Sequence, residues 1–590
     1  MKRVLNNKKK GGIMRRIINS TIMHLVLLFI AWSFSAGIYG KNYLVNSSSE
    51  LNSITSALLP GDTIKLASGT WNNQELLFKG IGTINQNIVL TVETKNGTVL
   101  TGASQLKIFG EYLTVDGLRF EKGYRDNNAV IEFRNSSSEI SHNCRLTNTS
   151  IIDYNPSDLN TDYKWVSVYG TKNRIDHCHF EGKNHSGTTL VVWITDEPNY
   201  TQIDNNYFGA RPDLGYNGGE TIRIGTSSNS MKESRALVEY NLFEECDGEI
   251  EIISNKSCFN TYRYNTFRNN NGCLTLRHGN DCDVYGNYFI GEDKASGGVR
   301  IIGERHKVYN NYFENLKGDD YRSALCLMNG VPDSPLNRYF QVKDAVVAFN
   351  TIVNCKMPLI IGAGKDSEKT LAPTDCIIAN NAIDKTSGSK NIIIEDEPAN
   401  MLWEGNVVNA DANDEPISTG VTYQDPSLEQ LSYMWRPSPG SILLNNAVGS
   451  YSFVELDLEQ NQRSATKTIG CDNGEVNAEW YPLSKEDVGP YSGQNEETGI
   501  VRAQQVKDMV KVYQQNGHYF FQVNNMEYLP ISYQIVDING KLLQKGILQN
   551  EVTFKNNGSG VYLAYFSSGN RFVQLHKLLT TERTLTKKVW

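Results

Sequence analysis

The fold is decided by four short stretches that share one design: Val238-Glu-Tyr-Asn-Leu-Phe243, Tyr262-Arg-Tyr-Asn-Thr-Phe267, Val284-Tyr-Gly-Asn-Tyr-Phe289 and Val308-Tyr-Asn-Asn-Tyr-Phe313. Each stretch leads from an apolar or aromatic residue through Asn to Phe. The final Phe recurs at intervals of roughly two dozen residues, and a fixed period of that length is typical of a solenoid. Related copies of the pattern lie at 203–208, 347–352 and 378–383.

A parallel β-helix explains this pattern physically. One repeat cannot bury its apolar face alone, but stacked repeats can, with Phe on Phe and Asn on Asn. The backbone of each coil then pairs with the coils above and below. Asn suits the bends because it tolerates a left-handed φ and bonds to nearby backbone. Between the Asn turns, a second set of apolar runs predicts one continuous sheet face: Thr221–Gly225, Ile250–Ile253, Leu274–Leu276, Gly298–Gly303, Leu325–Leu327 and Leu359–Gly362.

The N-terminal 40 residues have the layout of a signal peptide. A basic segment begins at Met14, which is a second candidate for the true start, and an apolar run from Ile22 to Trp32 leads to small residues. The run is too short to predict a stable membrane span, although an N-terminal anchor helix remains the alternative. The expected location is therefore outside the cytoplasm of a bacterium: secreted, periplasmic or on the cell surface.

Three further segments follow the signal peptide. Residues 41–490 are expected to form the β-helix, with 51–59 as a helical cap at its open end and Trp480–Pro490 as a terminal clamp. Residues 491–503 are polar and predict a linker. Residues 504–590 alternate as short strands with Asn-Gly and Gly-Asn turns, which predicts a small β-sandwich. The expected fold is therefore all-β.

The composition limits the possible partners. The net charge is −8 and no basic stripe is present, which argues against nucleic acid because nothing would neutralise the phosphates. An anionic substrate is still possible, since a local row of Arg and Lys can hold a polyanion. The spacings of the 10 cysteines match no zinc pattern, so most are expected to be small buried core residues.

The residues that carry chemistry gather around one pair of acids. Glu249 and Glu251 are two apart on a predicted strand, so both side chains project to one face. Two such charges repel unless a cation lies between them, and Ca²⁺ with oxygen ligands is the usual solution outside the cell. One coil earlier, Asn217 and Glu220 stand at a Gly-rich bend beside this pair.

Two basic residues belong to the same face. Lys256 follows the acid pair after a Ser-Asn turn, and Arg277 lies 21 residues further on, close to one coil. This set suits β-elimination on a uronate, in which the C5 proton is removed while the charge of the carboxylate is offset by a metal. Lys256 is the candidate base. Arg277 is placed to stabilise the leaving oxygen, although its high basicity makes outright proton donation debatable.

Several ordered motifs resemble polysaccharide lyase family 6: Asn217-Gly-Gly-Glu-Thr-Ile-Arg-Ile-Gly225, Glu249-Ile-Glu-Ile-Ile-Ser-Asn-Lys-Ser257, Leu274-Thr-Leu-Arg-His-Gly279 and Gly298-Val-Arg-Ile-Ile-Gly303. The resemblance covers roughly residues 42 to 490, and that family holds alginate lyases and chondroitinase B on a right-handed parallel β-helix. It implies Ca²⁺ ligands at Asn217, Glu220, Glu249 and Glu251. It further implies that Lys256 is the base, that Arg277 is the acid, and that the substrate is contacted by His278, Arg300 and Arg322.

The resemblance also favours one substrate. The chondroitinase B branch lacks an acid where Glu220 stands and an arginine that matches Arg300, so alginate is favoured over dermatan sulfate. Two other classes stay open: a non-catalytic, glycan-binding β-helix of the cell surface, and a β-helix hydrolase. A hydrolase would need a pair of carboxylic acids at glycosidase separation, and the sequence offers none outside the predicted metal site.

The C-terminal segment resembles the sorting domain of the type IX secretion system, which would make that secretion machinery a partner. The tail from Leu575 to Trp590 departs from the family because it runs on with a basic sequence. An accessory sandwich domain without a sorting role is therefore the alternative.

Overall fold

The computed structural model describes residues 40–384, 387–410, 414, 416–492, 510–515, 518–523, 531–537, 541–555, 560–568 and 572–580. Contacts divide the chain into two units, Met1–Pro490 and Tyr491–Trp590. The predicted signal peptide, apart from Gly40, and the predicted linker, apart from Tyr491 and Ser492, lie outside the described residues. Among those residues, no helix has the length and apolar character needed to cross a bilayer.

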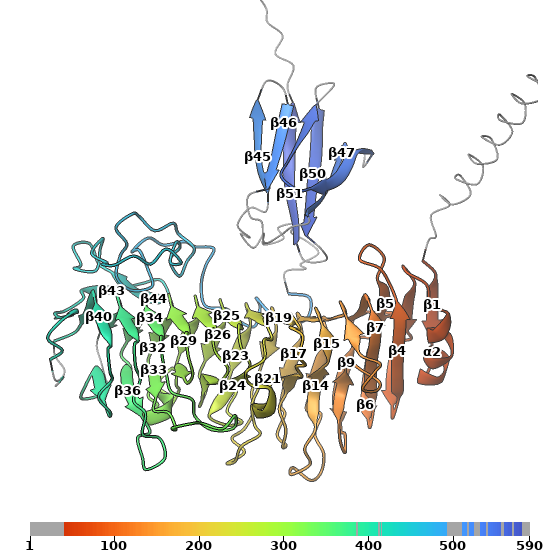
Figure 1. The fold of residues 1–590 in the computed structure, drawn as a ribbon. Coiled ribbons are helices and arrows are strands. Elements are labelled where there is room, and N and C mark those ends of the chain that lie inside the picture. Colours follow the sequence, from red (N-terminus) through yellow and green to blue (C-terminus); the bar gives the residue numbers. More distant parts are fainter. Residues whose placement is uncertain are drawn as a thin grey trace, which may run out of the picture. The chain divides into compact units, whose positions relative to one another are not determined.

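The first unit is the predicted parallel β-helix, in which each coil passes in turn through three long sheets (Figure 1). Sheet 1 contains β1 (Asn42–Val45), β2 (Thr63–Leu66), β5 (Ile88–Val92), β8 (Leu113–Asp116), β12 (Arg145–Thr147), β16 (Arg174–Asp176), β19 (Gln202–Asp204), β22 (Leu237–Glu239), β25 (Thr261–Arg263), β28 (Asp283–Tyr285), β31 (Lys307–Tyr309), β34 (Val346–Ala348), β37 (Ile377–Ala379) and β40 (Leu402–Glu404).

Sheet 2 follows sheet 1 in each coil. It contains β3 (Gly69–Asn72), β6 (Thr98–Gly102), β9 (Arg119–Gly123), β13 (Ser150–Ile152), β17 (His179–Glu181), β20 (Tyr207–Phe208), β23 (Leu242–Glu244), β26 (Thr266–Arg268), β29 (Tyr288–Ile290), β32 (Tyr312–Glu314), β35 (Thr351–Val353), β38 (Ala382–Asp384), β41 (Asn406–Val408) and β42 (Val421–Tyr423).

Sheet 3 completes each coil, and its strands include the six apolar runs predicted to form one face. It contains β4 (Glu75–Ile81), β7 (Gln105–Glu111), β10 (Ala129–Glu132), β11 (Ser141–His142), β14 (Lys164–Val168), β15 (Gly170–Thr171), β18 (Leu190–Val192), β21 (Ile222–Gly225), β24 (Glu251–Lys256), β27 (Cys273–His278), β30 (Val299–Ile301), β33 (Leu325–Met328), β36 (Leu359–Ala363) and β39 (Ile392–Ile394).

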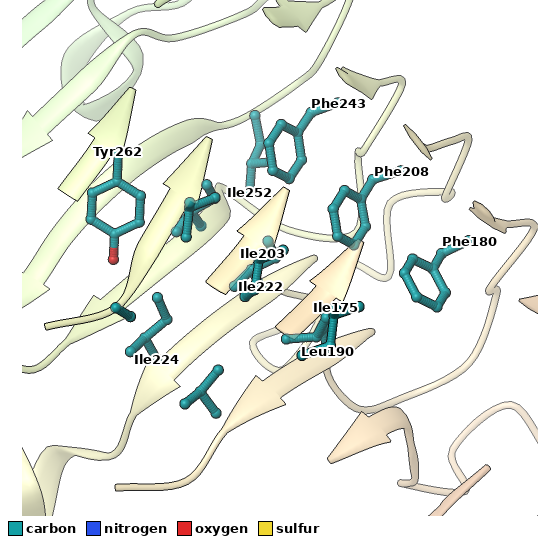
Figure 2. Close-up of a cluster of buried hydrophobic side chains, with 14 of the residues drawn as sticks. Ile175, Phe180, Leu190, Ile203, Phe208, Ile222, Ile224, Phe243, Ile252 and Tyr262 are labelled. Carbon is teal, nitrogen blue, oxygen red and sulfur yellow. The ribbon is translucent and has the colours of Figure 1, made fainter. Parts of the chain in front are cut away.

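The core consists of side chains stacked coil upon coil. The rings of Phe208, Phe243 and Phe267 lie nearly parallel, with centroids 4.9 and 4.7 Å apart, and Phe289 and Phe313 continue the stack. Figure 2 shows the beginning of this stack, with isoleucines from the neighbouring sheets packed beside it. The predicted contact of Phe on Phe is confirmed.

The repeated Asn residues form an internal ladder, as predicted. In each step, the backbone N–H and the Nδ2 of one Asn donate to the Oδ1 of the next; Asn241 donates both bonds to Asn265 at 3.0 Å. The left-handed φ falls on the residue before the ladder Asn. That residue is Asn, as predicted, in three coils (55° in Asn205, 54° in Asn310 and 52° in Asn380), but it is Tyr in two others (54° in Tyr240 and 55° in Tyr264). The ladder Asn must keep its amide directed into the solenoid, so its neighbour turns the chain.

Both predicted end elements are present. A helix covers the open N-terminal end, although it starts three residues earlier than expected: α2 (Ser48–Ile54) is capped by the Ser47 hydroxyl, which accepts from the Glu50 N–H at 3.2 Å, and η1 (Thr55–Ala57) continues it. The clamp lies back over sheet 2, where the Leu483 N–H donates to Thr266 Oγ1 at 2.8 Å. Shorter elements are η2 (Ser227–Asn229), η3 (Asp320–Arg322) and the hairpin β43 (Leu428–Leu431) and β44 (Met434–Pro437).

The second unit is the predicted sandwich. Its two antiparallel sheets have three and four strands. They share one apolar core that includes Phe521 and Phe566, whose ring centroids lie 5.2 Å apart. The strands are β45 (Val510–Gln515), β46 (His518–Val523), β47 (Ile531–Asp537), β48 (Leu542–Leu548), β49 (Glu551–Lys555), β50 (Gly560–Ser568) and β51 (Phe572–Thr580).

The cysteines behave as predicted. All ten lie in the part of the chain that the structure describes, where every one is buried and none forms a disulfide. Burial raises the pKa of Cys246 to about 12, so this thiol stays uncharged and acts as a small apolar residue.

Candidate active site

The predicted site residues gather on the outer face of sheet 3. The register places Arg223 on β21 beside Ser254 on β24, Ser254 beside Thr275 on β27, and Thr275 beside Arg300 on β30. Paired residues of parallel strands share a face. Arg223, Ser254, Thr275 and Arg300, from four successive coils, therefore form one row on the outer face of sheet 3.

A bulge in β24 decides which side chains join this row. Glu251 pairs with Cys273, but Ile253 pairs with Leu274, so Ile252 is an extra residue. Ile252 and Ile253 are both buried in the core. Because Glu251 and Lys256 are five residues apart, a regular strand would send them to opposite faces. The bulge corrects the alternation and places both on the outer face.

Three carboxylates lie at the centre of the site. Glu220 is 4% exposed and accepts a hydrogen bond from Thr188 Oγ1 at 3.0 Å. Glu249 accepts from the Gly218 N–H at 2.8 Å, and Glu251 accepts from the Ser254 hydroxyl. Burial, together with the negative charges of Glu220 and Glu251, raises the pKa of Glu249 to about 8. The predicted repulsion among these acids is therefore present.

Three basic residues surround the acids. Lys256 Nζ lies 3.8 Å from Glu220 Oε1. Arg277 Nε and Arg300 Nη1 each lie 3.7 Å from Glu251 Oε1. These distances place the predicted lysine and arginine beside the carboxylates on one outer face. Burial lowers the pKa of Arg277, although the guanidinium keeps its charge at neutral pH.

The other predicted residues lie further from this centre. Asn217 is exposed at the bend beside Gly218. His278 is buried at 1% exposure, and its pKa is lowered to about 3 by burial and by the charges of Arg277 and Lys256, so its ring is neutral. Arg322 donates to Asn271 Oδ1 at 3.0 Å and pairs with Asp319 at 3.5 Å.

Aromatic residues that were not predicted from the sequence frame the site. The ring of Tyr339 lies 4.2 Å from the guanidinium of Arg277, and its hydroxyl accepts from Arg300 Nη2 at 3.2 Å. On the opposite side, Arg223 lies over the Trp193 ring at 5.4 Å. Tyr339 could have been suspected from the insertion between residues 314 and 346, which interrupts the regular repeat.

A Ca²⁺ ion is compatible with the donor atoms that are present. Carboxylate and amide oxygens are the ligands that Ca²⁺ prefers, and the repulsion that raises the pKa of Glu249 is what a cation would relieve. Within the described residues, no group of three His, Cys, Asp or Glu side chains is placed to hold a metal ion by itself. Asn217, backbone carbonyls or water would therefore have to complete the coordination.

Comparisons with known proteins identify the family. The model of the chondroitinase B family matches residues 45–442. Among solved structures, the PL6 family alginate lyase AlyGC is 37% identical, with a TM-score of 0.65; the match covers 75% of this chain and 59% of that one. The chain thus spans about 60% of the length of AlyGC. No curated protein matches the chain significantly.

Two other solved structures are covered almost completely. A mannuronic acid specific polysaccharide family 6 lyase from the human gut microbiota is 32% identical, with a TM-score of 0.58 and coverage of 65% of this chain and 91% of that one. The PL6 family polysaccharide lyase Pedsa3628 from Pseudopedobacter saltans is 29% identical, with a TM-score of 0.57 and coverage of 63% and 94%. The chain therefore belongs to polysaccharide lyase family 6, the family of chondroitinase B.

Proposed function

We propose that this protein is a calcium-dependent polysaccharide lyase that cleaves alginate by β-elimination and releases unsaturated oligosaccharides. The observation that carries the proposal is the row on sheet 3, where Lys256, Arg277 and Arg300 surround three carboxylates on one outer face. A glycan-binding β-helix would have no need for a lysine and an arginine held at this separation from an acid cluster.

The residues of the chain divide the reaction between them. Lys256 takes the C5 proton of the uronate as the base. As the C4–C5 double bond forms and the C4–O bond breaks, Arg277 stabilises the negative charge on the leaving glycosidic oxygen, which takes its proton from solvent water. The contact with Glu251 keeps the Arg277 guanidinium in place. Arg300, which Tyr339 and Glu251 hold by hydrogen bond and charge, binds a substrate carboxylate. Arg322 extends this positive surface, whereas the predicted substrate contact His278 is buried and its Nε2 lies 3.3 Å from the Ser227 hydroxyl.

Asn217, Glu220, Glu249 and Glu251 are the residues that would hold Ca²⁺. A bound Ca²⁺ would offset the charge of the uronate carboxylate and so favour loss of the C5 proton. Glu251 would share its carboxylate between the ion and its two arginine partners.

Alginate is the favoured substrate. The relatives AlyGC and the gut enzyme are an alginate lyase and a mannuronic acid specific lyase by name. Glu220 and Arg300, which have no counterpart in the chondroitinase B branch, both belong to the cluster of acids and bases. Dermatan sulfate is the second candidate, because the matching family model is that of chondroitinase B.

The decisive assay follows the absorbance of unsaturated uronate products on alginate, polymannuronate, polyguluronate and dermatan sulfate, with and without a chelator. We expect product from alginate, loss of activity on chelation and recovery with added Ca²⁺. Full activity after complete removal of Ca²⁺ would contradict the role of the metal. Cleavage without new ultraviolet absorbance would identify a hydrolase, and no cleavage of any polymer would favour the non-catalytic alternative.

We further propose that the protein is exported from a bacterial cell by means of residues 1–40 and that residues 504–590 address it to the type IX secretion machinery. The support is the sequence layout alone. Expression of the full chain in a type IX-competent host, followed by fractionation and mass spectrometry, tests both parts. We expect an extracellular protein that lacks residues 1–40, and we expect removal of 504–590 to retain it in the periplasm. If the shortened chain is exported as before, residues 504–590 are an accessory sandwich domain without a sorting role.

A further inference from the structure

Two connections between sheet 3 and sheet 1 are much longer than their neighbours. In the coils of β27 and β30, residues 279–282 and 302–306 are enough to reach the next strand. The coils of β33 and β36 use residues 329–345 and 364–376 instead, which we call the first and second insertions. Loops that leave a rigid scaffold often carry functional residues, and both insertions belong to the two coils that follow Arg300.

The second insertion fastens the first. The Gly330 N–H donates to the Leu371 carbonyl at 2.8 Å, and the Leu371 N–H donates back to the Gly330 carbonyl at 2.9 Å. Further along the first insertion, Arg338 Nε donates to Glu368 Oε1 at 2.7 Å. An exposed ion pair alone would stabilise the loop little, but together with the backbone bridge it fixes the first insertion at two points. The first insertion can therefore hold other groups in place.

The first insertion contacts Arg277 through its main chain and through one ring. Arg277 Nη1 donates to the Arg338 carbonyl at 3.1 Å, and Nη2 donates to the Asn337 carbonyl at 3.5 Å. The Tyr339 ring centroid lies 4.2 Å from the guanidinium carbon, within the range of a cation–π contact. The remaining nitrogen, Nε, lies 3.7 Å from Glu251 Oε1. These contacts fix the plane of the guanidinium, and each Nη carries a second N–H that can face the substrate.

The hydroxyl of the same tyrosine contacts Arg300. It accepts from Arg300 Nη2 at 3.2 Å, and the Tyr321 ring centroid lies 4.4 Å from the Arg300 guanidinium. Arg300 is only 3% exposed, so few of its N–H groups can face a substrate. The orientation of the guanidinium therefore decides which N–H a carboxylate can reach, and Tyr339 is the residue that contacts both arginines.

We propose that Tyr339 is a positioning residue with two separable roles. Its ring holds Arg277 in the orientation that the elimination step needs, and its hydroxyl holds Arg300 in the orientation that binds the uronate carboxylate. The inference rests on the proposed lyase function, in which Arg277 acts on the leaving oxygen and Arg300 binds the substrate. Small displacements matter here, because a shift of about 1 Å in a reacting group can cost about 10²-fold in rate.

Two substitutions separate the roles. Tyr339→Phe keeps the ring and removes the hydroxyl, so we expect KM for alginate to rise about tenfold, as for one lost hydrogen bond to a charged group, with kcat nearly unchanged. Tyr339→Leu also removes the ring and should lower kcat by at least about tenfold.

The controls are Tyr124→Phe and Tyr124→Leu, at a tyrosine that is 42% exposed in the N-terminal coils. Both should leave kcat and KM as they are in the parent. The melting temperature of each variant is recorded as well, because a role in folding alone would lower the melting temperature without separating KM from kcat.

A double substitution tests whether the hydroxyl acts through Arg300. Arg300→Met should raise KM, and the addition of Tyr339→Phe should change KM no further, because the hydroxyl then has no guanidinium to orient. Additive effects on KM, or equal kcat in Tyr339→Leu and the parent, would overturn the inference. If Arg300→Met does not fold, the single substitutions of Tyr339 decide.

The parent is assayed first for unsaturated product, so that two failures can be told apart. A parent that forms no such product contradicts the proposed function, and this inference falls with it. An active parent in which Tyr339→Phe and Tyr339→Leu leave both constants unchanged contradicts this inference alone.

Discussion

Lys256 illustrates how much depends on the position of a single residue. Its Nζ lies 3.8 Å from Glu220 in the preceding coil, and its side chain is 18% exposed. It can therefore reach a polymer on the outer face and still be held by a carboxylate. Lys232, by contrast, pairs with the exposed Asp196. Among the described residues, it has no cluster of carboxylates and arginines from neighbouring coils beside it.

We expect Lys256→Ala to lower kcat by about 10²- to 10⁴-fold, the usual contribution of a general base. Ca²⁺ binding and the melting temperature should change little, since the side chain is partly exposed. Steady-state rates on alginate from product absorbance measure the effect, with Lys232→Ala as the matched control. Equal rates for both variants would show that Lys256 is not the base.

Gly248 allows two coils to approach closely. A Cβ at this position would lie 2.3 Å from the Gly219 carbonyl oxygen and 2.7 Å from Arg211 Nε. We therefore expect Gly248→Ala to push the Glu220 and Glu249 coils apart and to weaken Ca²⁺ binding by at least about tenfold, or about 1.4 kcal/mol. Calorimetric titration with Ca²⁺ measures this, with Gly546→Ala in the second unit as the control. Unchanged affinity would show that these two acids do not bind the ion together.

At the scale of the element, the bulge in β24 and the Asn ladder do different work. The bulge at Ile252 moves Lys256 to the same face as Glu251. The ladder holds the coils in register, because each Asn amide satisfies backbone groups of its own and neighbouring coils. A break in one rung leaves buried polar groups without partners, which is costly in a dry interior.

Asn265→Ala should therefore lower the free energy of unfolding by about 3 kcal/mol, because the Asn241 N–H and the Val238 carbonyl each lose a buried partner. Chemical denaturation followed by circular dichroism measures the change. Asn446→Ala, which removes one exposed hydrogen bond, should be nearly neutral. A loss of less than about 1 kcal/mol in Asn265→Ala would mean that a water molecule takes over the hydrogen bonds of the missing amide.

At the scale of the whole molecule, charged ladders on sheet 1 bind the coils to one another. Arg145 and Arg174 bridge to Asp176 and Asp204 at 2.5 Å across neighbouring strands. Burial by itself would raise the pKa of Asp176, but the hydrogen bonds from Arg145 and His177 and the charge of Arg174 lower it well below its ordinary value near 3.8. The folded state thus binds fewer protons at this carboxyl than the unfolded state.

The sign of the pH dependence follows from this lowered pKa. The stabilisation by Asp176 is complete above about pH 5, where the unfolded carboxyl is also ionised, and is lost as the pH falls through the folded pKa. We expect the melting temperature to drop between pH 5 and about pH 2, and Asp176→Asn to be less stable at pH 7 with a shallower drop in acid. Asp158→Asn, at an exposed turn, is the control. The same slope in Asp176→Asn and the parent would contradict the prediction.

The solenoid, its period, the order of its apolar runs and the charged residues of one face could be predicted from the sequence, because stacking forces the same residue types to recur at the same place in each coil. Tertiary structure alone decided three things. The bulge at Ile252 is a shift in the pairing of β24 with β27, so alternation along one strand cannot reveal it. Tyr339 reaches Arg277 from an insertion outside the repeat. The two insertions, which belong to different coils, meet at Gly330 and Leu371 only because the coils stack. The acidic and basic residues of the candidate site could be predicted from the sequence. The distances between them could not, because they depend on contacts between residues far apart along the chain.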